Sequence, residues 1–309
     1  MKKVYFTVLA IGLGILTQSG ALAQDDLMSL LDEETPQEEE KKVSSTFKTL
    51  RIINAQTIET IKAKSLMFSI LHRFGNVSGG GHAFFGFDNA SNIRFGFDYG
   101  VTDKLIIGVG RSKVKEHIDG NLKYKLLAQT KDNKVPVSIA WYSNAGFTPM
   151  ISPKNSSDED KWTKPAHRFS YAHQLIIARK FSPAFSFEVL PTLVHRNYVT
   201  SSVNETNGAE EENDLAAIGF AGRIKFTKRI SLVADYFYVF SKFRENNLDF
   251  PFYAPLGIGI EIETGGHVFH ANFTNSSGLI ENDYLPATSD SWLDGDIKLG
   301  FNISRVFYL

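Results

Sequence analysis

Charged side chains recur at alternate positions inside apolar segments of this sequence, where each would face away from its apolar neighbours. Six of them are cationic and five are anionic, so the two signs nearly match. An ion-selective pore usually carries a surplus of one sign at its narrowest point, whereas matched charges in a narrow interior tend to pair and fill it. We therefore expect structural pairing, with selection of a small polar solute as the alternative. The candidates to line such an interior are Arg94, Asp98, Lys123, Lys125, Glu188, Arg223, Lys225, Asp235, Glu261, Glu263 and Lys298.

The histidines do not show the spacing of a hydrolase built on one strand. Alternate residues of a strand share a face, so a histidine base reaches a serine hydroxyl from two positions away. None of the eight histidines is followed two residues later by serine. A base from another strand stays open as an alternative, and a lipid-modifying site would then draw on Arg111, His117 or His195. We expect no catalytic residues and no enzyme activity.

Metal and phosphate motifs are also weak. His267 and His270 are three residues apart, which places them on opposite faces of a strand, so they cannot chelate one ion. The glycine-rich "SGGGH" at 78–82 lacks the lysine and hydroxyl residue that follow in a phosphate loop. We expect no metal site and no cofactor. Nucleic acid is not expected as a partner, because no long basic stretch with interleaved aromatic residues is found.

From residue 65 onward apolar residues recur with a period of two, which indicates strands. In "NIRFGFDYG", Ile93, Phe95 and Phe97 share one face, while Arg94 and Asp98 share the other. About twelve strands are predicted, an even number as in bacterial single-chain barrels. They cover residues 65–74, 92–100, 104–112, 120–129, 135–143, 167–180, 184–198, 215–226, 230–241, 253–264, 266–274 and 296–308.

The connections between these segments alternate between short and long. Tight turns are predicted at 101–103, 182–183, 227–229 and 265–266. Long polar connections are predicted at 75–91, 144–166, 199–214, 242–252 and 275–295. Outer-membrane barrels have short periplasmic turns and longer extracellular loops, whereas a soluble sandwich has no physical reason to sort its loops in this way. One connection, 131–136, is longer than its place among the tight turns suggests.

The apolar face of the strands fits a lipid environment. A lipid-facing charge at the bilayer midplane costs roughly 2–4 kcal/mol, so the charged face must look inward. A sheet can span a bilayer only if it closes and leaves no unpaired edge. Aromatic residues near strand ends would suit the headgroup level, namely Tyr99, Trp141, Tyr142, Tyr198, Tyr253 and Phe307. The predicted fold class is therefore all-β, a transmembrane antiparallel barrel of about 12 strands.

The sequence divides into four predicted regions. Residues 1–23 read as a signal peptide, with Lys2 and Lys3 before an apolar run and a small-residue cleavage site at 21–23. Residues 24–45 are expected to form an acidic disordered leader, since 24–42 carry eight acids and two lysines. Residues 46–64 would be an extra strand, a helix or a plug, and 65–309 the barrel. Because the chain has no cysteine, it has no disulfide and no cysteine to carry lipid.

Several phrases spread over the barrel resemble a known family. They are "HRFG" (72–75), "FFGFDNASNIRFGFDYGVTDKL" (84–105), "GVGRSK" (108–113), "KYKLLAQT" (123–130), "GGHVF" (265–269), "FTNSSG" (273–278) and "GFNISRVF" (300–307). The sequence is similar here to outer-membrane β-barrel proteins of Bacteroidota that carry a domain-of-unknown-function label. The resemblance implies the fold and the outer membrane of a Gram-negative bacterium, and it brings no catalytic residues.

Function is predicted only in outline. The leading hypothesis is a narrow channel or facilitator for a small polar solute. The alternatives are a non-conducting scaffold or accessory protein that binds a partner through its outer loops or leader, and a lipid-modifying enzyme. Expected partners are outer-membrane lipid and lipopolysaccharide, and the insertion machinery, which would recognise the aromatic end of the C-terminal strand. Both termini would be periplasmic. A plug formed by residues 46–62 would favour the scaffold.

Overall fold

A computed structural model describes residues 42–309 of the chain. The predicted signal peptide and most of the predicted acidic leader lie outside the described residues. Twelve strands form the wall: β1 (Ser65–Asn76), β2 (Ala90–Gly100), β3 (Leu105–Ser112), β4 (Ile118–Leu127), β5 (Ser138–Phe147), β6 (Phe169–Lys180), β7 (Phe185–Arg196), β8 (Asp214–Lys225), β9 (Ile230–Phe240), β10 (Leu256–Thr264), β11 (His267–Thr274) and β12 (Lys298–Tyr308). The helical turns are η1 (Val77–Gly86), η2 (Val114–Glu116), η3 (Pro165–Arg168) and α2 (Glu281–Ala287).

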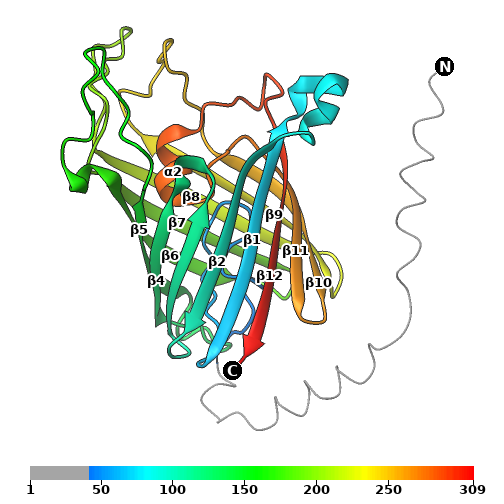
Figure 1. Cartoon of the computed structure of the whole chain (residues 1–309). Coiled ribbons are helices and arrows are strands. Elements are labelled where there is room, and N and C mark those ends of the chain that lie inside the picture. Colours follow the sequence, from blue (N-terminus) through cyan, green and yellow to red (C-terminus); the bar gives the residue numbers. More distant parts are fainter. Residues whose placement is uncertain (1–41) are drawn as a thin grey trace, which may run out of the picture. The chain divides into compact units, whose positions relative to one another are not determined.

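The wall is a closed antiparallel barrel in which each strand pairs with its sequence neighbours and β1 pairs with β12 (Figure 1). At this seam Leu66 lies opposite Phe307 and Ile70 opposite Ile303. The aromatic C-terminal segment is thus the last strand of the wall, and it leaves no open edge. The predicted twelve-stranded antiparallel barrel is confirmed.

Side chains alternate across the wall as the period-two pattern predicts. On β9, the outward Tyr236 and Tyr238 are exposed, whereas the intervening Asp235 and Phe237 are buried in the interior. Exposed apolar residues follow the same face on other strands, among them Val109, Leu193 and Ile260. No helix formed by the described residues is long and apolar enough to cross a membrane.

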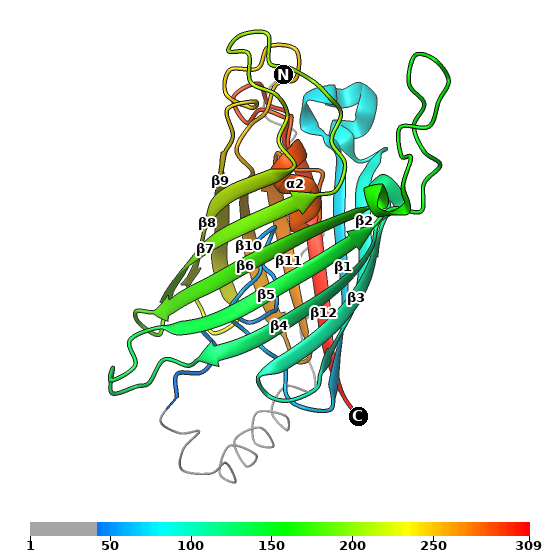
Figure 2. The same ribbon diagram turned by 90° about the vertical axis from the view of Figure 1, so that its left-hand side faces the viewer.

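Short and long connections alternate along the chain, as predicted. The tight turns and the C-terminus lie at one end of the barrel and the long loops at the other (Figure 1). A typical tight turn closes through the N–H of Val101, which donates to the carbonyl of Leu105 at 2.9 Å. The last long loop carries α2, which folds back into the mouth of the barrel (Figure 2). The sequence pattern did not predict this helix.

The bounds of β5 differ most from the prediction. The prediction for β5 was 135–143, but residues 130–135 form a separate turn in which the N–H of Thr130 donates to the carbonyl of Val135 at 3.0 Å. The strand therefore starts at Ser138 and ends at Phe147. As a result Tyr142 lies in mid-strand, on the inward face and 1% exposed. The prediction that Tyr142 lies at the headgroup level is wrong.

Candidate functional site

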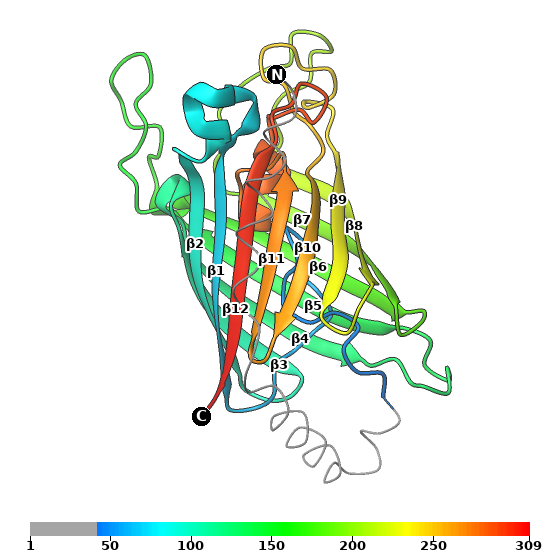
Figure 3. The same ribbon diagram turned by 90° about the vertical axis from the view of Figure 1, so that its right-hand side faces the viewer.

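The interior of the barrel is occupied by residues 46–62, here called the plug, which lie inside the wall (Figure 3). The plug is a hairpin without regular secondary structure. The N–H of Ile52 donates to the carbonyl of Ala55 at 3.0 Å, and the N–H of Thr57 donates to the carbonyl of Leu50 at 2.9 Å. The chain then returns to the tight-turn end, where the Asp103 carboxylate accepts the N–H of Ala63 at 2.8 Å. Of the three forms open for residues 46–64, the structure shows a plug.

The tip of the plug is bound by charged side chains of the wall. The carboxylate of Asp235 on β9 accepts the backbone N–H groups of Asn54 at 2.6 Å and Ala55 at 2.9 Å. The guanidinium of Arg73 on β1, fully buried, donates to the carbonyl of Ile53 at 2.8 Å. Gly257 on β10 permits this approach, because a Cβ there would lie 2.7 Å from Ile53 and 2.8 Å from Asp235.

The two arms of the plug are bound in the same manner. The ammonium of Lys123 on β4 donates to the carbonyl of Leu50 at 3.0 Å and to that of Thr57 at 2.8 Å, so it ties both arms to the wall. On β7 the carboxylate of Glu188 accepts the N–H of Ile58 at 3.2 Å. An irregular chain in a dry interior leaves many backbone groups without partners, and these charged side chains satisfy several of them.

Apolar packing accompanies these hydrogen bonds. Plug residues Phe47, Ile52, Ile53 and Ile58 are each no more than 1% exposed. They share one cluster with inward wall residues, namely Ile176, Leu190, Val194, Val233 and Phe237. Each such side chain contributes about 1.5–3 kcal/mol relative to exposure to water. This apolar core inside the barrel offsets the entropy lost on ordering the hairpin, about 1–2 kcal/mol per residue.

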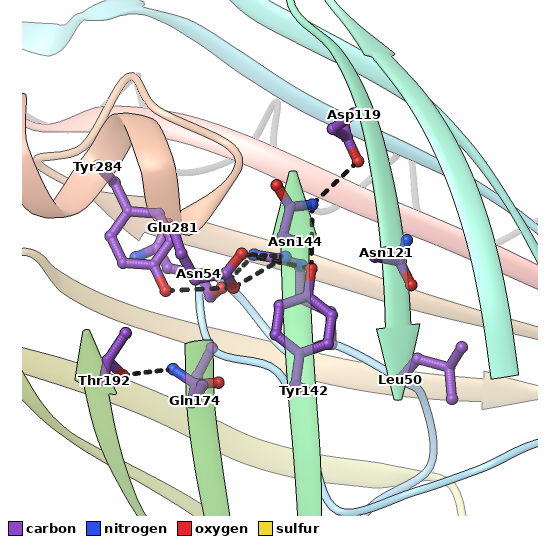
Figure 4. A network of polar contacts seen from close by, with 12 residues as sticks. Leu50, Asn54, Asp119, Asn121, Tyr142, Asn144, Gln174, Thr192, Glu281 and Tyr284 are labelled. Atoms are coloured by element: carbon purple, nitrogen blue, oxygen red, sulfur yellow. Dashed lines mark hydrogen bonds and ion pairs between the residues drawn. The ribbon is translucent and has the colours of Figure 1, made fainter. Parts of the chain in front are cut away.

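The plug meets α2, which enters from the opposite end of the barrel. Arg51 of the plug and Glu281 of α2 form a buried ion pair at 2.9 Å. Glu281 also accepts the hydroxyl protons of Tyr142 at 3.4 Å and Tyr284 at 3.5 Å. Figure 4 shows this network continuing through Asn144 to Asp119 on β4. The Arg51–Glu281 ion pair therefore joins the plug to α2, the two segments that fill the lumen.

The outer side of α2 is fixed by Asp283. Its carboxylate lies 3.1 Å from the ammonium of Lys115 and 3.1 Å from Nδ1 of His117. Burial alone would raise the pKa of Asp283, but Lys115 and the hydrogen bond to His117 outweigh it, and the pKa lies below its usual value. Asp283 is therefore ionised at neutral pH and holds α2 in the barrel mouth.

The remaining inward charges pair along the wall. Arg94 makes a bidentate contact with Asp119, at 2.9 and 2.6 Å. Arg223 donates to Glu261 at 2.7 Å and to Glu263 at 2.9 Å. Glu263 also pairs with Lys48 of the plug at 3.0 Å. These contacts leave little free charge facing the lumen.

The other candidates from the sequence lie as follows. Asp98 is buried and accepts an amide proton of Asn121 at 3.2 Å. Lys298 is buried and pairs with Asp290 of the last loop. Lys125 and Lys225 are half-buried toward the tight-turn ends of their strands. Beside the plug, among Arg94, Asp98, Lys123 and their neighbours, a cavity of 40 Å³ remains, which is room for a few water molecules.

Several residues of the site were missed by the sequence analysis. Arg73 shares the inward face of β1 with Met67, Ser69 and Leu71, so strict alternation along "SLMFSILHRF" could have identified it. Asp119 lies one residue before the predicted start of its strand. Nothing in the sequence pattern could have indicated that Arg51 and Glu281 meet, because they are 230 residues apart.

The histidines form contacts that the sequence did not predict. The hydroxyl of Ser143 on β5 lies 2.9 Å from Nδ1 of His173 on β6, so a serine and a histidine of neighbouring strands meet on one face. Within residues 42–309 no carboxylate or amide holds the other nitrogen of His173, and both side chains lie on the outward face. His270 is buried against Glu261 at 3.2 Å, while His267 faces outward near Arg305.

Comparison with known proteins gives a family and a set of similar folds. The family described as "Membrane bound beta barrel domain (DUF5777)" matches residues 47–307. No curated protein matches the chain. Similar solved structures include an outer membrane channel from Pseudomonas putida F1, with 10% identity over 81% of this chain and 98% of that chain and a TM-score of 0.48. The NanC porin has 7% identity over 79% and 99% of the two chains, at a TM-score of 0.45. LpxR from Salmonella typhimurium has 9% identity over 79% of this chain and 100% of that chain, with a TM-score of 0.36.

Proposed function

Since this chain belongs to the family of membrane-bound β-barrel domains, we propose that it is an outer-membrane barrel closed by its own plug, and that it acts as a non-conducting scaffold. Its outer loops and its N-terminal leader would then carry the interactions with partners. The family match begins at residue 47, so the plug is part of the shared domain.

One observation carries this proposal: the charged side chains that would select a solute are bound to the plug. Lys123, Glu188 and Asp235 all contact plug backbone groups. Removing any of them would leave a buried polar group without its partner, which costs about 1–3 kcal/mol. A lumen built to pass solute would keep such groups free.

The orientation and the partners are proposed on physical grounds. The tight turns and the C-terminus would face the periplasm, with the long loops outside, as is usual for such barrels. Lipid and lipopolysaccharide would surround the exposed apolar band. The aromatic end of β12 would serve recognition by the insertion machinery, which fits the exposure of Phe307 and Tyr308 at the seam.

A gated channel is the second candidate. Within the described residues the plug is joined to the wall largely through side chains, and no plug residue takes part in the strand ladders of the wall. It could leave the lumen without opening the barrel. Withdrawal of the plug would then expose Lys123, Glu188 and Asp235 to a passing polar solute.

We further propose that the barrel is not an enzyme. Within residues 42–309 no carboxylate bonds the second imidazole nitrogen of His173 as in a catalytic triad, and two polar groups facing lipid gain simply by bonding each other. A Ser143→Ala variant should leave the lipid profile of the membrane unchanged. Accumulation of an unprocessed lipid in that variant alone would establish a catalytic role instead.

Single-channel recording in planar bilayers tests the closed barrel. The intact protein should show no openings over a range of salt concentrations, whereas a variant with residues 46–62 replaced by a Gly/Ser linker of equal length should open stepwise. Should that variant fail to insert, Ile53→Asp offers a milder change, because it places a carboxylate beside Asp235 and expels the tip. Openings by the intact protein would favour the channel. Silence of a folded, plug-free barrel would show that α2 alone closes the lumen, and would contradict the role given to the plug.

A further inference from the structure

The ladder between β9 and β10 stops before the outer end of the wall. The last paired residues are Tyr236 and Leu256. Beyond them the N–H of Phe237 donates to the carbonyl of Pro255 at 2.9 Å. Within the described residues no further backbone hydrogen bond joins the end of β9 to the segment that precedes β10. Pro255 has no N–H to continue the ladder. The N–H of Tyr253 donates instead to the carbonyl of Thr288, at 2.9 Å, so the segment before β10 turns toward the last long loop and away from β9.

A cleft of 540 Å³ occupies the place where the strands part. Its lining includes Tyr238 and Phe240 from the outward face of β9, and Val239 from the inward face of the same strand. Leu285 of α2 lines it from inside the barrel. Both faces of one strand line a cleft only where the neighbouring strand has left, so this cleft passes through the wall. Its volume lies in the range of small-molecule sites, about 300–1,000 Å³.

The cleft opens at the outer edge of the lipid-facing surface. A tilted strand rises about 2.5 Å per residue along the barrel axis, so Tyr238 and Phe240 lie about 20–25 Å above Ile230, near the top of an apolar band about 25 Å tall. Both side chains are half exposed on the face that contacts lipid, at 50% and 55%. The cleft is thus continuous with the bilayer.

Its lining combines aromatic rings with charged side chains. The rings are those of Tyr238, Phe240, Phe252 and Tyr253. At the rim, Arg244 is already paired with Glu211 and Glu212, both at 3.4 Å. Lys242, on the same rim, is exposed and forms no ion pair within residues 42–309. An amphiphile with an acyl chain matches the aromatic lining, and Lys242, beside the exposed Glu245, is the lining cation left to meet an anionic headgroup.

We propose that the cleft between β9 and the segment 252–255 binds one acyl chain of an outer-leaflet lipid, with the anionic headgroup at Lys242. The chain enters sideways from the bilayer and lies against Tyr238 and Phe240, with its end toward Val239 and Leu285. This site requires only that the barrel lies in lipid, and it holds whether or not the lumen conducts.

Photolabelling of the full-length protein tests this site. The protein is reconstituted in vesicles of phosphatidylethanolamine and phosphatidylglycerol, with a small fraction of phosphatidylglycerol carrying a diazirine on its acyl chain, and adducts are mapped by mass spectrometry. Residues 238–240 and 252–253 should be labelled about tenfold more than Phe97, a preference worth ~1.4 kcal/mol. Phe97 is the matched control, because it faces lipid with 46% exposure and both its ladders are intact.

Variants and competitors complete the test. Ala254→Trp and, independently, Val239→Trp fill the cleft and should reduce its labelling to the level of Phe97, whereas Val109→Trp on the intact wall should not. Free palmitate should compete for the cleft, and inorganic phosphate should not, which identifies the acyl chain as the bound part. Equal labelling of Phe97 and the cleft in a barrel that resists SDS unfolding would overturn the proposal, and so would competition by phosphate alone.

Discussion

At the scale of single residues, three of the charges inside this barrel are explained by the backbone of the plug. Asp235, Lys123 and Arg73 each contact N–H or carbonyl groups of the hairpin rather than a carboxylate or guanidinium across the lumen. A buried charge that accepts or donates several hydrogen bonds stays compatible with a dry interior. The near balance of signs in the sequence instead reflects the charges that pair along the wall, such as Arg94 with Asp119 and Arg223 with Glu261.

Substitution of Asp235 should loosen the tip of the plug. Asp235→Ala leaves the N–H groups of Asn54 and Ala55 without an acceptor, and each should cost about 1–3 kcal/mol. Hydrogen exchange of residues 53–57 should accelerate, while exchange of the strands stays slow. Asp98→Ala is the matched control, since Asp98 is a buried lumen carboxylate whose hydrogen-bond partner, Asn121, belongs to the wall. Equal exchange at the tip in both variants would contradict this assignment.

Acidification should release α2 at a pH set by Asp283. The pKa of Asp283 is depressed in the folded protein, so its contribution to stability is present above the ordinary aspartate pKa and is lost as pH falls through the lower folded value. A spin label on Ala287→Cys should therefore be immobile at neutral pH and mobile only below about pH 4. In an Asp283→Asn background the label should be mobile throughout. Release already at pH 6 would assign the effect to another group.

The period-two pattern predicts which way a side chain faces, but it does not predict the depth of a residue in the wall or its neighbours on the next strand. Period-two alternation correctly separates Asp235 from Tyr236, because neighbouring side chains of a strand must face opposite sides. It failed for Tyr142, since the start of β5 depends on a turn at 130–135 that moves the strand relative to the membrane. It also missed the Ser143–His173 contact, because cross-strand neighbours depend on the register of β5 with β6.

At the scale of elements, the wall was predictable and its contents were not. All twelve strands lie within a few residues of the predicted segments, since lipid outside and a packed interior impose a strict alternation. The plug and α2 have no such pattern. Their places are fixed by contacts between distant residues such as Arg51 and Glu281, which no local feature of the sequence encodes.

A lipid-facing charge should destabilise the wall according to its depth. Ile260 lies at the middle of β10 and Ile230 at the tight-turn end of β9, and both face outward with 49% and 41% exposure. Ile260→Lys should lower the free energy of unfolding by roughly 2–4 kcal/mol, and Ile230→Lys by about 0–1 kcal/mol. Urea unfolding in lipid vesicles measures both. Equal losses would mean that the apolar face does not lie in a bilayer of the assumed depth.

At the scale of the whole barrel, the plug fills the lumen from the tight-turn end and α2 from the loop end. The described part of the chain is therefore a wall around its own core, with a polar network linking the two ends. The last long loop contacts the plug directly through the Glu281–Arg51 ion pair. The lateral cleft lies beside α2 and is lined by its Leu285.

Thiol labelling tests most directly whether the plug fills the lumen in a membrane. The chain has no cysteine, so a single introduced cysteine reports unambiguously. Thr57→Cys removes only a methyl group and exchanges the hydroxyl for a thiol at a position fully buried in the plug, whereas Lys131→Cys lies on an exposed turn at the tight-turn end of the barrel. With a water-soluble maleimide added to the folded protein, Lys131→Cys should react at once and Thr57→Cys only after unfolding. Reaction of Thr57→Cys at the rate of Lys131→Cys in the folded barrel would contradict the account.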